Sequence, residues 1–307
     1  MADFDASSDN HDGGKSRRAM KSRRFIWIVG ALILALGSMA LCFWVTMEPS
    51  DQGKKLSVWL QEMYSGPPET FNTGAEAVRH MGTKAVPCLL RRLRSSDSRL
   101  KLTLVELLTK QSLIRFHFTP AADRRAQAAC GFVALGPAAT EAIPALAELL
   151  YQAQTAKDAA WALAGISEEG LREVTEAITN RNAKIRAGAA AGLGLAQPKN
   201  RAAVLALVAR LQDEDHDVRG QAAYSLGLML READIVVPAL ATRLQDRHPL
   251  VRMRAATALG EFGARAEPVV GALSNAIRDS DGSVVNAAIK ARERIQAEIA
   301  VRAEGRP

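Results

Sequence analysis

Side chains that could do chemistry are few in this sequence and lie far apart. The 3 cysteines show neither a CxxC arrangement nor the spacing of metal ligands. The histidines have no HxxxH or HExxH pattern that would place two ligands on one helical face; they are His11, His80, His117, His216 and His248. The sequence contains no phosphate-binding glycine loop, no G-x-S-x-G elbow and no signature pair of carboxylates. We therefore assign no catalytic, cofactor-binding or metal-ligating residue and expect a protein that is not an enzyme.

Two thiols, Cys88 and Cys130, lie outside the apolar N-terminal stretch that holds Cys42. Both stand in an apolar helical context. In an oxidising compartment they could form one disulfide, although they belong to different repeats. Two buried free thiols are the alternative that we favour, and the separation of the two Cα atoms decides between them.

The composition indicates a protein built almost entirely of α-helices. Of the 307 residues 48% are hydrophobic but only 5% are aromatic, so alanine, leucine and valine supply most of the apolar surface. No long block alternates polar and apolar residues with β-branched and aromatic enrichment. Lysine and arginine exceed aspartate and glutamate by 40 to 33, a mild surplus that is more typical of a solvated surface than of a nucleic-acid-binding stripe.

A repeat of 33 residues runs through positions 171 to 289. One repeat position is acidic or asparagine, and the position six residues later is arginine in all units but the last; the two series are Asn180, Asp213, Asp246, Asp279 and Arg186, Arg219, Arg252, Val285. The same register aligns alanines and glycines, namely Ala189, Ala222, Ala255, Ala288 and Gly194, Gly227, Gly260.

The remaining half of each unit carries an apolar stripe with separations of three, four and seven residues, as one face of a helix requires. In the first unit the stripe is Leu171, Val174 and Ile178. Each unit is therefore predicted to contain two antiparallel helices, one Ala-rich and one Leu/Val-rich, with short turns near the repeated glycines. Neither helix can bury its stripe alone, so the units must stack into a solenoid.

This pattern resembles HEAT repeats, and among them the short bacterial variant described as phycobilisome-lyase-like, through the segments DEDHDVRGQAAYSLG, EADIVVPALATRL and DRHPLVRMRAATALGEFG. The resemblance implies an all-α solenoid of the HEAT/armadillo type, in which Asp213 and Asp246 form a ladder with Arg219 and Arg252 along the turns. Physical reasoning gives the acidic residue two tasks: it caps the following helix and pairs with the arginine one and a half turns later.

The solenoid is predicted to span residues 71–301, as about six helix pairs and a capping helix. Upstream, the segments GTKAVPCLL and GPAATEAIPALAELL keep the Gly, Pro and Leu turn signature without the Asp-Arg pair. Pro87, Pro144 and Pro238 are each predicted in the first turn of a helix, where a missing N–H costs little. The polar helix from Ser283 to Val301 is expected to cap the stack, with residues 302–307 as a tail.

The N-terminal region predicts one membrane-spanning helix. Residues 1–24 form a polar tail that is expected to be disordered and that ends in a basic cluster. Residues 25–47 carry no charge and would reach roughly 34 Å, enough to cross a hydrocarbon core of about 30 Å. Trp27 and Trp44 lie near the two ends, where indole rings favour the membrane interface. Residues 48–70 are expected to be a linker with a short helix.

Two processing routes compete with a retained anchor. A cleaved signal peptide normally has an apolar region of about 7 to 15 residues and a small-x-small site, which we do not find here. A lipoprotein would use Cys42, but the bulky Leu41 precedes it. Because basic residues stay in the cytoplasm, the N-terminus is expected inside and the repeat domain outside the cytoplasm, in the periplasm if the membrane is a bacterial inner membrane.

Residues 111–122 interrupt the helical rhythm with Phe116, His117, Phe118 and Pro120. We interpret this segment as a loop between repeats. A docking point for a partner is the alternative, because loops often carry recognition and phenylalanine side chains anchor well.

These features favour a non-catalytic, membrane-anchored scaffold for a protein partner. The expected binding surface is a concave face made by the stacked second helices, with the exposed side chains Arg91, Arg172, Glu176, Arg210 and Arg243. Two alternatives remain. The resemblance admits a phycobilin-lyase-like enzyme or enzyme partner, which a bound tetrapyrrole would favour. Some HEAT-like proteins bind nucleic acid, which strongly salt-dependent DNA binding would favour, but export of the domain and its modest charge argue against it.

Overall fold

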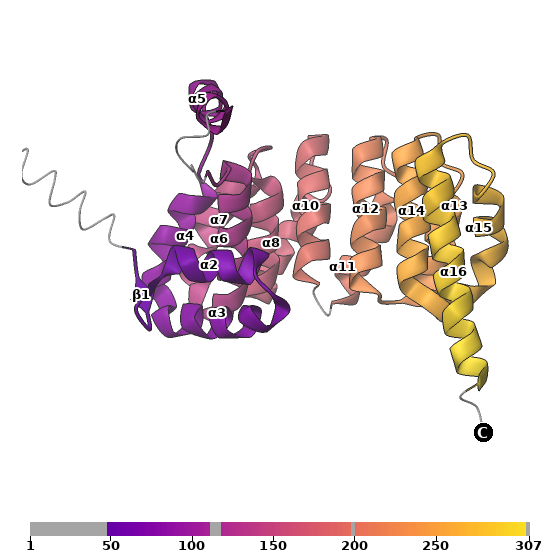
Figure 1. The fold of residues 1–307 in the computed structure, drawn as a ribbon, viewed down its shortest axis with the longest axis horizontal. Helices are drawn as coiled ribbons and strands as arrows, with labels where there is room; N and C mark the ends of the chain where they lie inside the picture. Colours follow the sequence, from indigo (N-terminus) through magenta and orange to yellow (C-terminus); the bar gives the residue numbers. More distant parts are fainter. Residues whose placement is uncertain (1–47, 111–117, 198–199, 305–307) are drawn as a thin grey trace, which may run out of the picture. The chain divides into compact units, whose positions relative to one another are not determined.

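The computed structural model describes residues 48–110, 118–197 and 200–304 (Figure 1). The chain divides into the units Met1–Glu48 and Pro49–Pro307, and the second unit contains every element described below. The span predicted at residues 25–47 lies outside the described residues, as do residues 111–117 of the expected loop. Within the described residues one run, Ala121–Leu150, is long and apolar enough to cross a membrane, but more than half of its most apolar window is buried inside the fold.

A small hairpin and a helix begin the folded unit. The strands β1 (Ser50–Asp51) and β2 (Lys54–Lys55) pair in antiparallel fashion, a local feature that the composition did not reveal. The helix α2 (Leu56–Ser65) packs on α3 and α6 and buries four apolar side chains: Leu56, Trp59, Leu60 and Met63. This part of the expected linker is therefore packed structure.

Six helix pairs, each a first helix followed by a second helix, succeed one another within the described residues. A 3-10 segment joins the two helices in three pairs: α3 (Pro68–Met81), η1 (Gly82–Ala85), α4 (Val86–Leu93); α6 (Ala121–Leu135), η2 (Gly136–Ala142), α7 (Ile143–Leu150); and α14 (Pro249–Phe262), η3 (Gly263–Val269), α15 (Val270–Ala276). The other pairs are α8 (Ala156–Ile166), α9 (Glu168–Ala177); α10 (Ala183–Ala196), α11 (Arg201–Arg210); and α12 (His216–Met229), α13 (Ala233–Arg243). A single helix, α16 (Gly282–Glu304), lies where the capping helix was predicted. The second helix packs mainly on the first helix of the next pair, or on α16 after the last pair, except that α9 packs mainly on α8.

Polar side chains at the turns determine where several helices begin. Asn182, Asn200 and Asp215 each accept a hydrogen bond from a backbone N–H two residues further on, at the starts of α10, α11 and α12. The first helices α10 and α12 end at residues with positive φ, Gln197 and Leu230. These caps explain why the sequence folds into short helices of regular length.

The repeated glycines lie inside the first helices, two residues before the helix ends, so the turns begin near them as predicted. A Cβ atom at Gly227 would lie 2.9 Å from the Cα atom of Ala258 in the next first helix. Gly260 faces Ala291 in the same way. Glycine is needed at these positions because two first helices approach each other closely, and its missing side chain makes that approach possible.

The first helices form the more tightly packed layer. Each first helix, from α6 to α16, contacts the next first helix directly. The second helices are further apart: from α7 onward in the described chain, only α7 and α9 are in substantial contact with each other. The second helices instead bury their apolar stripe against the first helices, through residues such as Leu171, Val174, Leu207, Leu240 and Leu273. Helices that touch through glycine and alanine lie closer together than helices separated by larger side chains. The layer of first helices is therefore shorter than the layer of second helices, and it forms the inner, concave side of the stack.

Two of the three predicted helix-starting prolines lie as expected. Pro87 and Pro144 are in the first turns of α4 and α7. Pro238 is in the middle of α13, because that helix already begins at Ala233, directly after Glu232 in the left-handed conformation. The prediction for Pro238 was therefore wrong.

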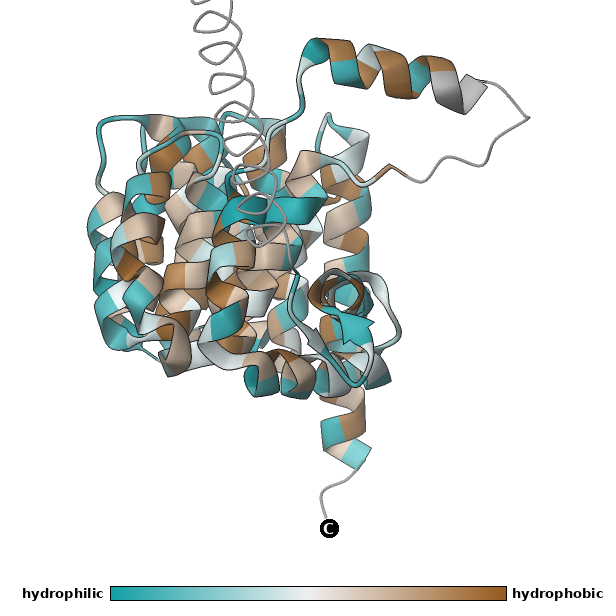
Figure 2. Ribbon diagram, turned by 90° about the vertical axis from the view of Figure 1, so that its left-hand side faces the viewer, coloured by the Kyte–Doolittle hydropathy of each residue, from teal (hydrophilic) through white to brown (hydrophobic). Residues whose placement is uncertain are grey.

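One helix, α5 (Arg99–Lys110), is an insertion between the first two pairs. It stands clear of the helix pairs in both Figure 1 and Figure 2. The colouring in Figure 2 shows hydrophobic residues along it.

Candidate functional site

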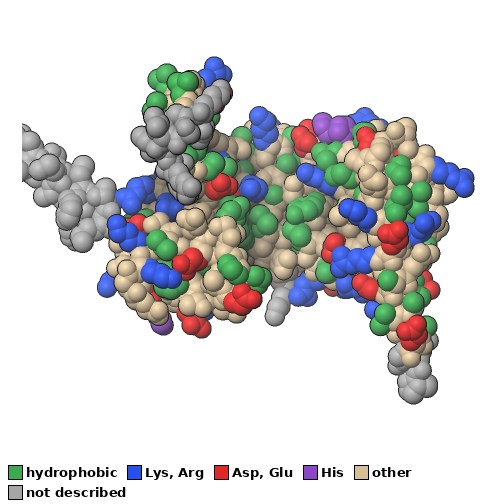
Figure 3. All heavy atoms as spheres, in the orientation of Figure 1, with side chains coloured by type: hydrophobic (Ala, Val, Ile, Leu, Met, Phe, Trp, Pro, Cys, Tyr) green, Lys and Arg blue, Asp and Glu red, His purple; other side chains and the backbone are tan. Residues whose placement is uncertain are grey.

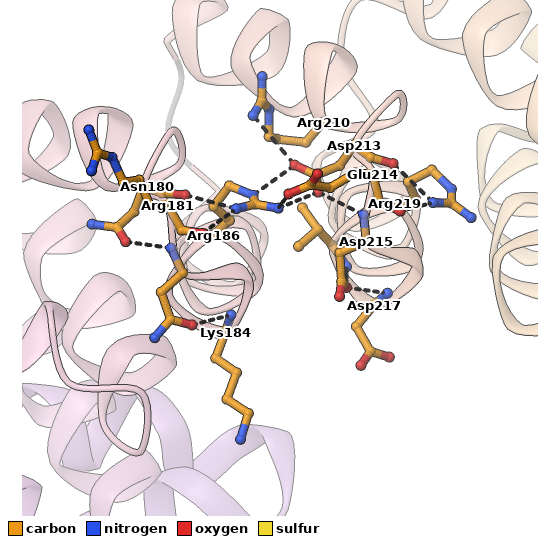
Figure 4. A network of polar contacts seen from close by, with 12 residues as sticks. Asn180, Arg181, Lys184, Arg186, Arg210, Asp213, Glu214, Asp215, Asp217 and Arg219 are labelled. Carbon is orange, nitrogen blue, oxygen red and sulfur yellow. Dashed lines mark hydrogen bonds and ion pairs between the residues drawn. The ribbon is translucent and has the colours of Figure 1, made fainter.

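A ladder of arginine and aspartate side chains runs along the turns before the first helices (Figure 4). Arg186 donates from Nε and Nη2 to the two carboxylate oxygens of Asp213, at 2.8 and 2.7 Å. Its Nη1 donates to the carbonyls of Asn180 and Arg181, at 2.9 and 3.0 Å. One guanidinium thus joins the turn of its own unit to the turn of the next.

The arrangement recurs one and two units later. Arg219 binds Asp246 at 2.7 and 2.8 Å, and Arg252 binds Asp279 with two bonds of 2.7 Å. This corrects the predicted pairing, because each aspartate pairs with the arginine of the preceding unit and not with the one six residues later. The later arginine binds the turn carbonyls, as Arg219 Nη1 does with the Asp213 carbonyl at 2.9 Å.

The ladder aspartates also do not cap the following helices. Asp213 Oδ1 accepts a hydrogen bond from the Asp215 N–H at 3.0 Å. Asp215 is the residue that caps α12, by accepting from the N–H groups of Asp217 and Val218. The first aspartate thus shapes the turn, and the second starts the helix.

Arg125 extends the ladder upstream, where the sequence shows no Asp-Arg pair with the repeated spacing. Its Nε donates to Asp158 Oδ2 at 3.2 Å, and its Nη1 donates to the Ser95 carbonyl at 2.9 Å. This pair is 33 residues apart, whereas the later pairs are 27 apart. The different spacing hid the pair, and the basic doublet Arg124-Arg125 near a helix start was the available signal.

Burial and ion pairing act in opposite directions on the ladder carboxylates. At Asp213 burial works to raise the pKa, but the hydrogen bonds from Arg186 and the backbone outweigh it and hold the pKa below its ordinary value; Asp246 behaves likewise. At Asp279 the hydrogen bond from its arginine is the largest influence and lowers the pKa. Burial raises the pKa of Asp158 despite its arginine partner. The ladder is therefore a structural device that joins neighbouring units.

The side chains predicted to meet a partner on the second helices do not form one free surface. Arg210 and Arg243 lie 3.4 and 3.6 Å from ladder carboxylates. Arg91, Arg172 and Glu176 are exposed. Because the second helices are the more widely spaced layer, the prediction that they form the concave face is corrected in favour of the first helices.

A groove lies on the exposed face of the first helices α8, α10, α12 and α14. Its volume is about 610 Å³, and its floor is made of small residues of α10: Ala183, Ala187, Gly188 and Ala191. The rest of the lining is Ala153 and the polar or charged side chains of Lys157, Asn182, Lys184, Asp215, Asp217, Gln221 and Arg254. In Figure 3 hydrophobic side chains gather over this part of the face.

The groove exists because α10 lacks side chains that its neighbours place at the same repeat positions. Gly188 stands where α12 has Gln221 and α14 has Arg254, and Ala191 stands where α12 has Tyr224. One wall is ordered by contacts among these residues. Arg254 Nη1 lies 3.4 Å from Gln221 Oε1, and the Arg254 guanidinium carbon lies 5.9 Å from the centre of the Tyr224 ring. The sequence signal for the groove was thus a pair of small residues, Gly188 and Ala191, at repeat positions where α12 has the larger Gln221 and Tyr224.

Reactive groups elsewhere in the described residues do not assemble into a second site. Cys88 and Cys130 are buried and are not joined in a disulfide, and burial raises the pKa of Cys130 to about 11. The imidazoles of His216 and His248, from neighbouring units, stack with their centres 3.8 Å apart. Within the described ranges no group of three or more His, Cys, Asp and Glu side chains is placed to hold a metal ion.

The helix pairs, their common register and the ladder define an α-helical repeat solenoid. Residues 204–293 match the family model for HEAT repeats. No curated protein matches the chain.

Several solved structures are similar to this chain at low identity. An engineered protein is 19% identical with a TM-score of 0.40, and the match covers 79% of this chain and 97% of that one. Human deoxyhypusine hydroxylase in complex with glycerol is 19% identical with a TM-score of 0.36, covering 79% and 84%. A designed armadillo repeat protein in complex with a (KR)4 peptide is 17% identical with a TM-score of 0.39, covering 68% and 99%. At these identities the likeness concerns the helical-repeat fold alone.

Proposed function

We propose that this chain is a non-catalytic scaffold that binds a segment of a partner protein in the groove of the first helices. The proposal rests on one observation: the groove combines a surface of small apolar residues from α10, its floor, with charged side chains along its edge, its rim. A floor without long side chains admits the backbone and the small apolar side chains of an extended segment. The rim then supplies polar contacts that determine orientation and specificity.

The charge of the rim favours a partner segment with acidic residues. Lys157 and Lys184 are exposed at the groove, and Arg254 adds a third cation. Of the two acidic rim residues, Asp215 already uses a carboxylate oxygen to cap α12. Lys157 Nζ already lies 3.7 Å from Asp158 Oδ1. Lys184 and Arg254 are therefore the rim cations that a partner carboxylate can pair with.

We further propose that residues 25–47 anchor the protein in a membrane. The support is the uncharged stretch, its two tryptophans and the basic cluster before it. The N-terminus would then lie in the cytoplasm and the repeat unit on the opposite side, which is the periplasm if the host is a bacterium. Flotation of the full chain with membranes, compared with a chain lacking residues 25–47, tests the anchor.

The groove is tested by a photo-crosslinking amino acid placed at Lys184 in the full chain in cells. The same probe at Ala202, which is exposed at the start of the second helix α11, is the matched control. We expect adducts with one defined protein from position 184 and none of that protein from position 202. Filling the groove by Ala187→Trp should abolish the adduct at 184, whereas Ala202→Trp should leave it unchanged. Adducts that resist Ala187→Trp would contradict binding in the groove.

A further inference from the structure

The helix α5 presents a leucine face to its surroundings. Leu100, Leu104 and Leu107 follow a spacing of four and three residues, which places them on one side of a helix. Their exposed fractions are 85, 57 and 61%. Single exposed leucines are common on protein surfaces, but three on one helical face indicate a surface that contacts another apolar phase.

The base of the α5 insertion is held in place by Asp97. Its carboxylate accepts hydrogen bonds from the Lys101 ammonium at 2.8 Å, from the Ala121 N–H at 2.6 Å and from Arg124 at 3.0 Å. The bond from Lys101 contributes most to holding the pKa of Asp97 at about 2. Lys101 Nζ also lies 4.9 Å from the centre of the Phe118 ring. These contacts join the chain before α5 to the chain after it, so the leucine face projects from a defined base.

The charge of α5 fits an anionic surface. The helix holds three basic residues and one acidic residue: Arg99, Lys101, Lys110 and Glu106. Arg99 and Lys101 flank the leucine face. Glu106 and the exposed Leu102 lie on the opposite side of the helix. A short helix with a leucine face and a basic surplus is typical of helices that lie in the interface of an anionic bilayer.

The sequence that precedes the folded unit indicates which apolar phase the leucine face of α5 can contact. The predicted span ends at Met47 and the folded unit begins at Pro49, so one residue separates them and adds at most about 3.6 Å. If the span is an anchor, the same membrane stays next to the repeat unit at all times. Tethering of this kind makes a second, weak membrane contact effectively intramolecular.

We propose that α5 lies in the interfacial layer of the membrane that holds the anchor, with its leucine face toward the acyl chains and its basic residues toward anionic headgroups. The inference rests on the proposed anchoring by residues 25–47. It adds a second attachment point, which would limit how the repeat unit and its groove turn relative to the membrane.

The test uses the full chain reconstituted into liposomes that contain anionic lipid, with Cys42→Ala so that the buried Cys88 and Cys130 are the only remaining native thiols. An environment-sensitive fluorophore is attached at Leu104→Cys on the leucine face or, as a matched control, at Glu106→Cys on the opposite face. Flotation reports the anchor, and quenching by nitroxide-labelled lipids reports contact with acyl chains. We expect blue-shifted emission and at least about threefold stronger quenching at position 104 than at position 106, and a weaker difference in neutral lipid.

The outcomes separate the two proposals. A chain that floats but shows water-like emission at position 104 overturns the α5 proposal and leaves the anchor intact. Blue-shifted emission without lipid quenching means that protein, such as a second copy, covers the leucines, and this also overturns it. A chain that does not float overturns both the anchor and the α5 contact. Circular dichroism of each labelled chain confirms that the fold is retained.

Discussion

Each ladder arginine satisfies two kinds of acceptor with one planar group. The Arg219 guanidinium binds both oxygens of Asp246 and, through Nη1, the carbonyls of Asp213 and Glu214. A lysine has one ammonium on a flexible stem and cannot reproduce this fork. The ladder therefore depends on arginine itself and not on positive charge alone.

Replacing Asp213 by asparagine should cost more stability than the same change at Asp158. Loss of the Asp213 carboxylate leaves the buried Arg186 without its counterion, which we expect to lower the free energy of unfolding by about 3 kcal/mol. Burial raises the pKa of Asp158, so its surroundings already favour a neutral group, and we expect a loss below about 1.5 kcal/mol there. Urea denaturation of residues 49–307 followed by circular dichroism measures both values; equal losses would contradict this ranking.

The sequence identified the ladder residues but not their partners. Arg186, Arg219 and Arg252 stand out because they recur at one repeat position. The nearest aspartate along the chain suggested the wrong partner, because the true one comes from the next unit, 27 residues away. Only the stacking of units brings these two side chains together, and local reasoning contains no information about that stacking.

The first helices pack closely against each other at glycine positions, where no side chain separates the two backbones. A Cβ atom at Gly192 would lie 2.6 Å from the backbone of both Ala160 and Trp161, atoms that cannot move aside without shifting the helix. Gly271 in α15 has no heavy atom within 4 Å of its would-be Cβ atom. The two glycines thus have opposite expected responses to the same change.

We expect Gly192→Ala to destabilise the repeat unit by at least about 2 kcal/mol, because the new methyl group overpacks the contact between α8 and α10. Gly271→Ala should stabilise it by about 0.5 to 1 kcal/mol, because alanine favours the helix and meets open space. Thermal and urea unfolding of the two variants measure the difference. A stabilising effect of Gly192→Ala would show that the first helices are not in close contact.

At the level of elements, periodicity predicted the helix pairs well and the surfaces poorly. The 33-residue register located the two helices of each unit because their buried stripes recur. Glycine signals both a helix end and a close contact, and the sequence suggested only the turns near Gly194, Gly227 and Gly260, not the helix contacts that these residues make. The groove could not be foreseen, because it is defined by the bulk that Gly188 and Ala191 lack relative to the neighbouring units.

The repeat unit as a whole should lose stability as the pH falls from about 4 to about 2. The pKa values of Asp97, Asp213, Asp246 and Asp279 are lowered in the fold, that of Asp97 to about 2. A carboxyl group with a lowered folded pKa stabilises the fold fully above its unfolded pKa near 4, and this contribution is lost as the pH falls through the folded value. Asp158, whose pKa is raised, acts in the opposite sense.

Urea midpoints of residues 49–307 at pH values of about 7, 4 and 2.5 measure this dependence. We expect the midpoint to fall mainly between the last two values. A variant carrying Asp213→Asn and Asp246→Asn should be less stable at neutral pH but should show a flatter acid dependence. A wild-type midpoint that stays constant down to the lowest pH would contradict the role of the paired carboxylates.

The shared junctions of the later units have a consequence for how such a chain can change in evolution. The contacts between α10, α12, α14 and α16 all use a glycine of one helix against the next, and the turns beside them use the same ladder. Unequal recombination between tandem gene segments could therefore add or remove 33 residues without creating a type of helix contact that the chain does not already contain. The groove behaves differently, because among α10, α12 and α14 only α10 has the small residues that form its floor. Chain length could then vary in whole helix pairs without adding a second copy of the groove on α10.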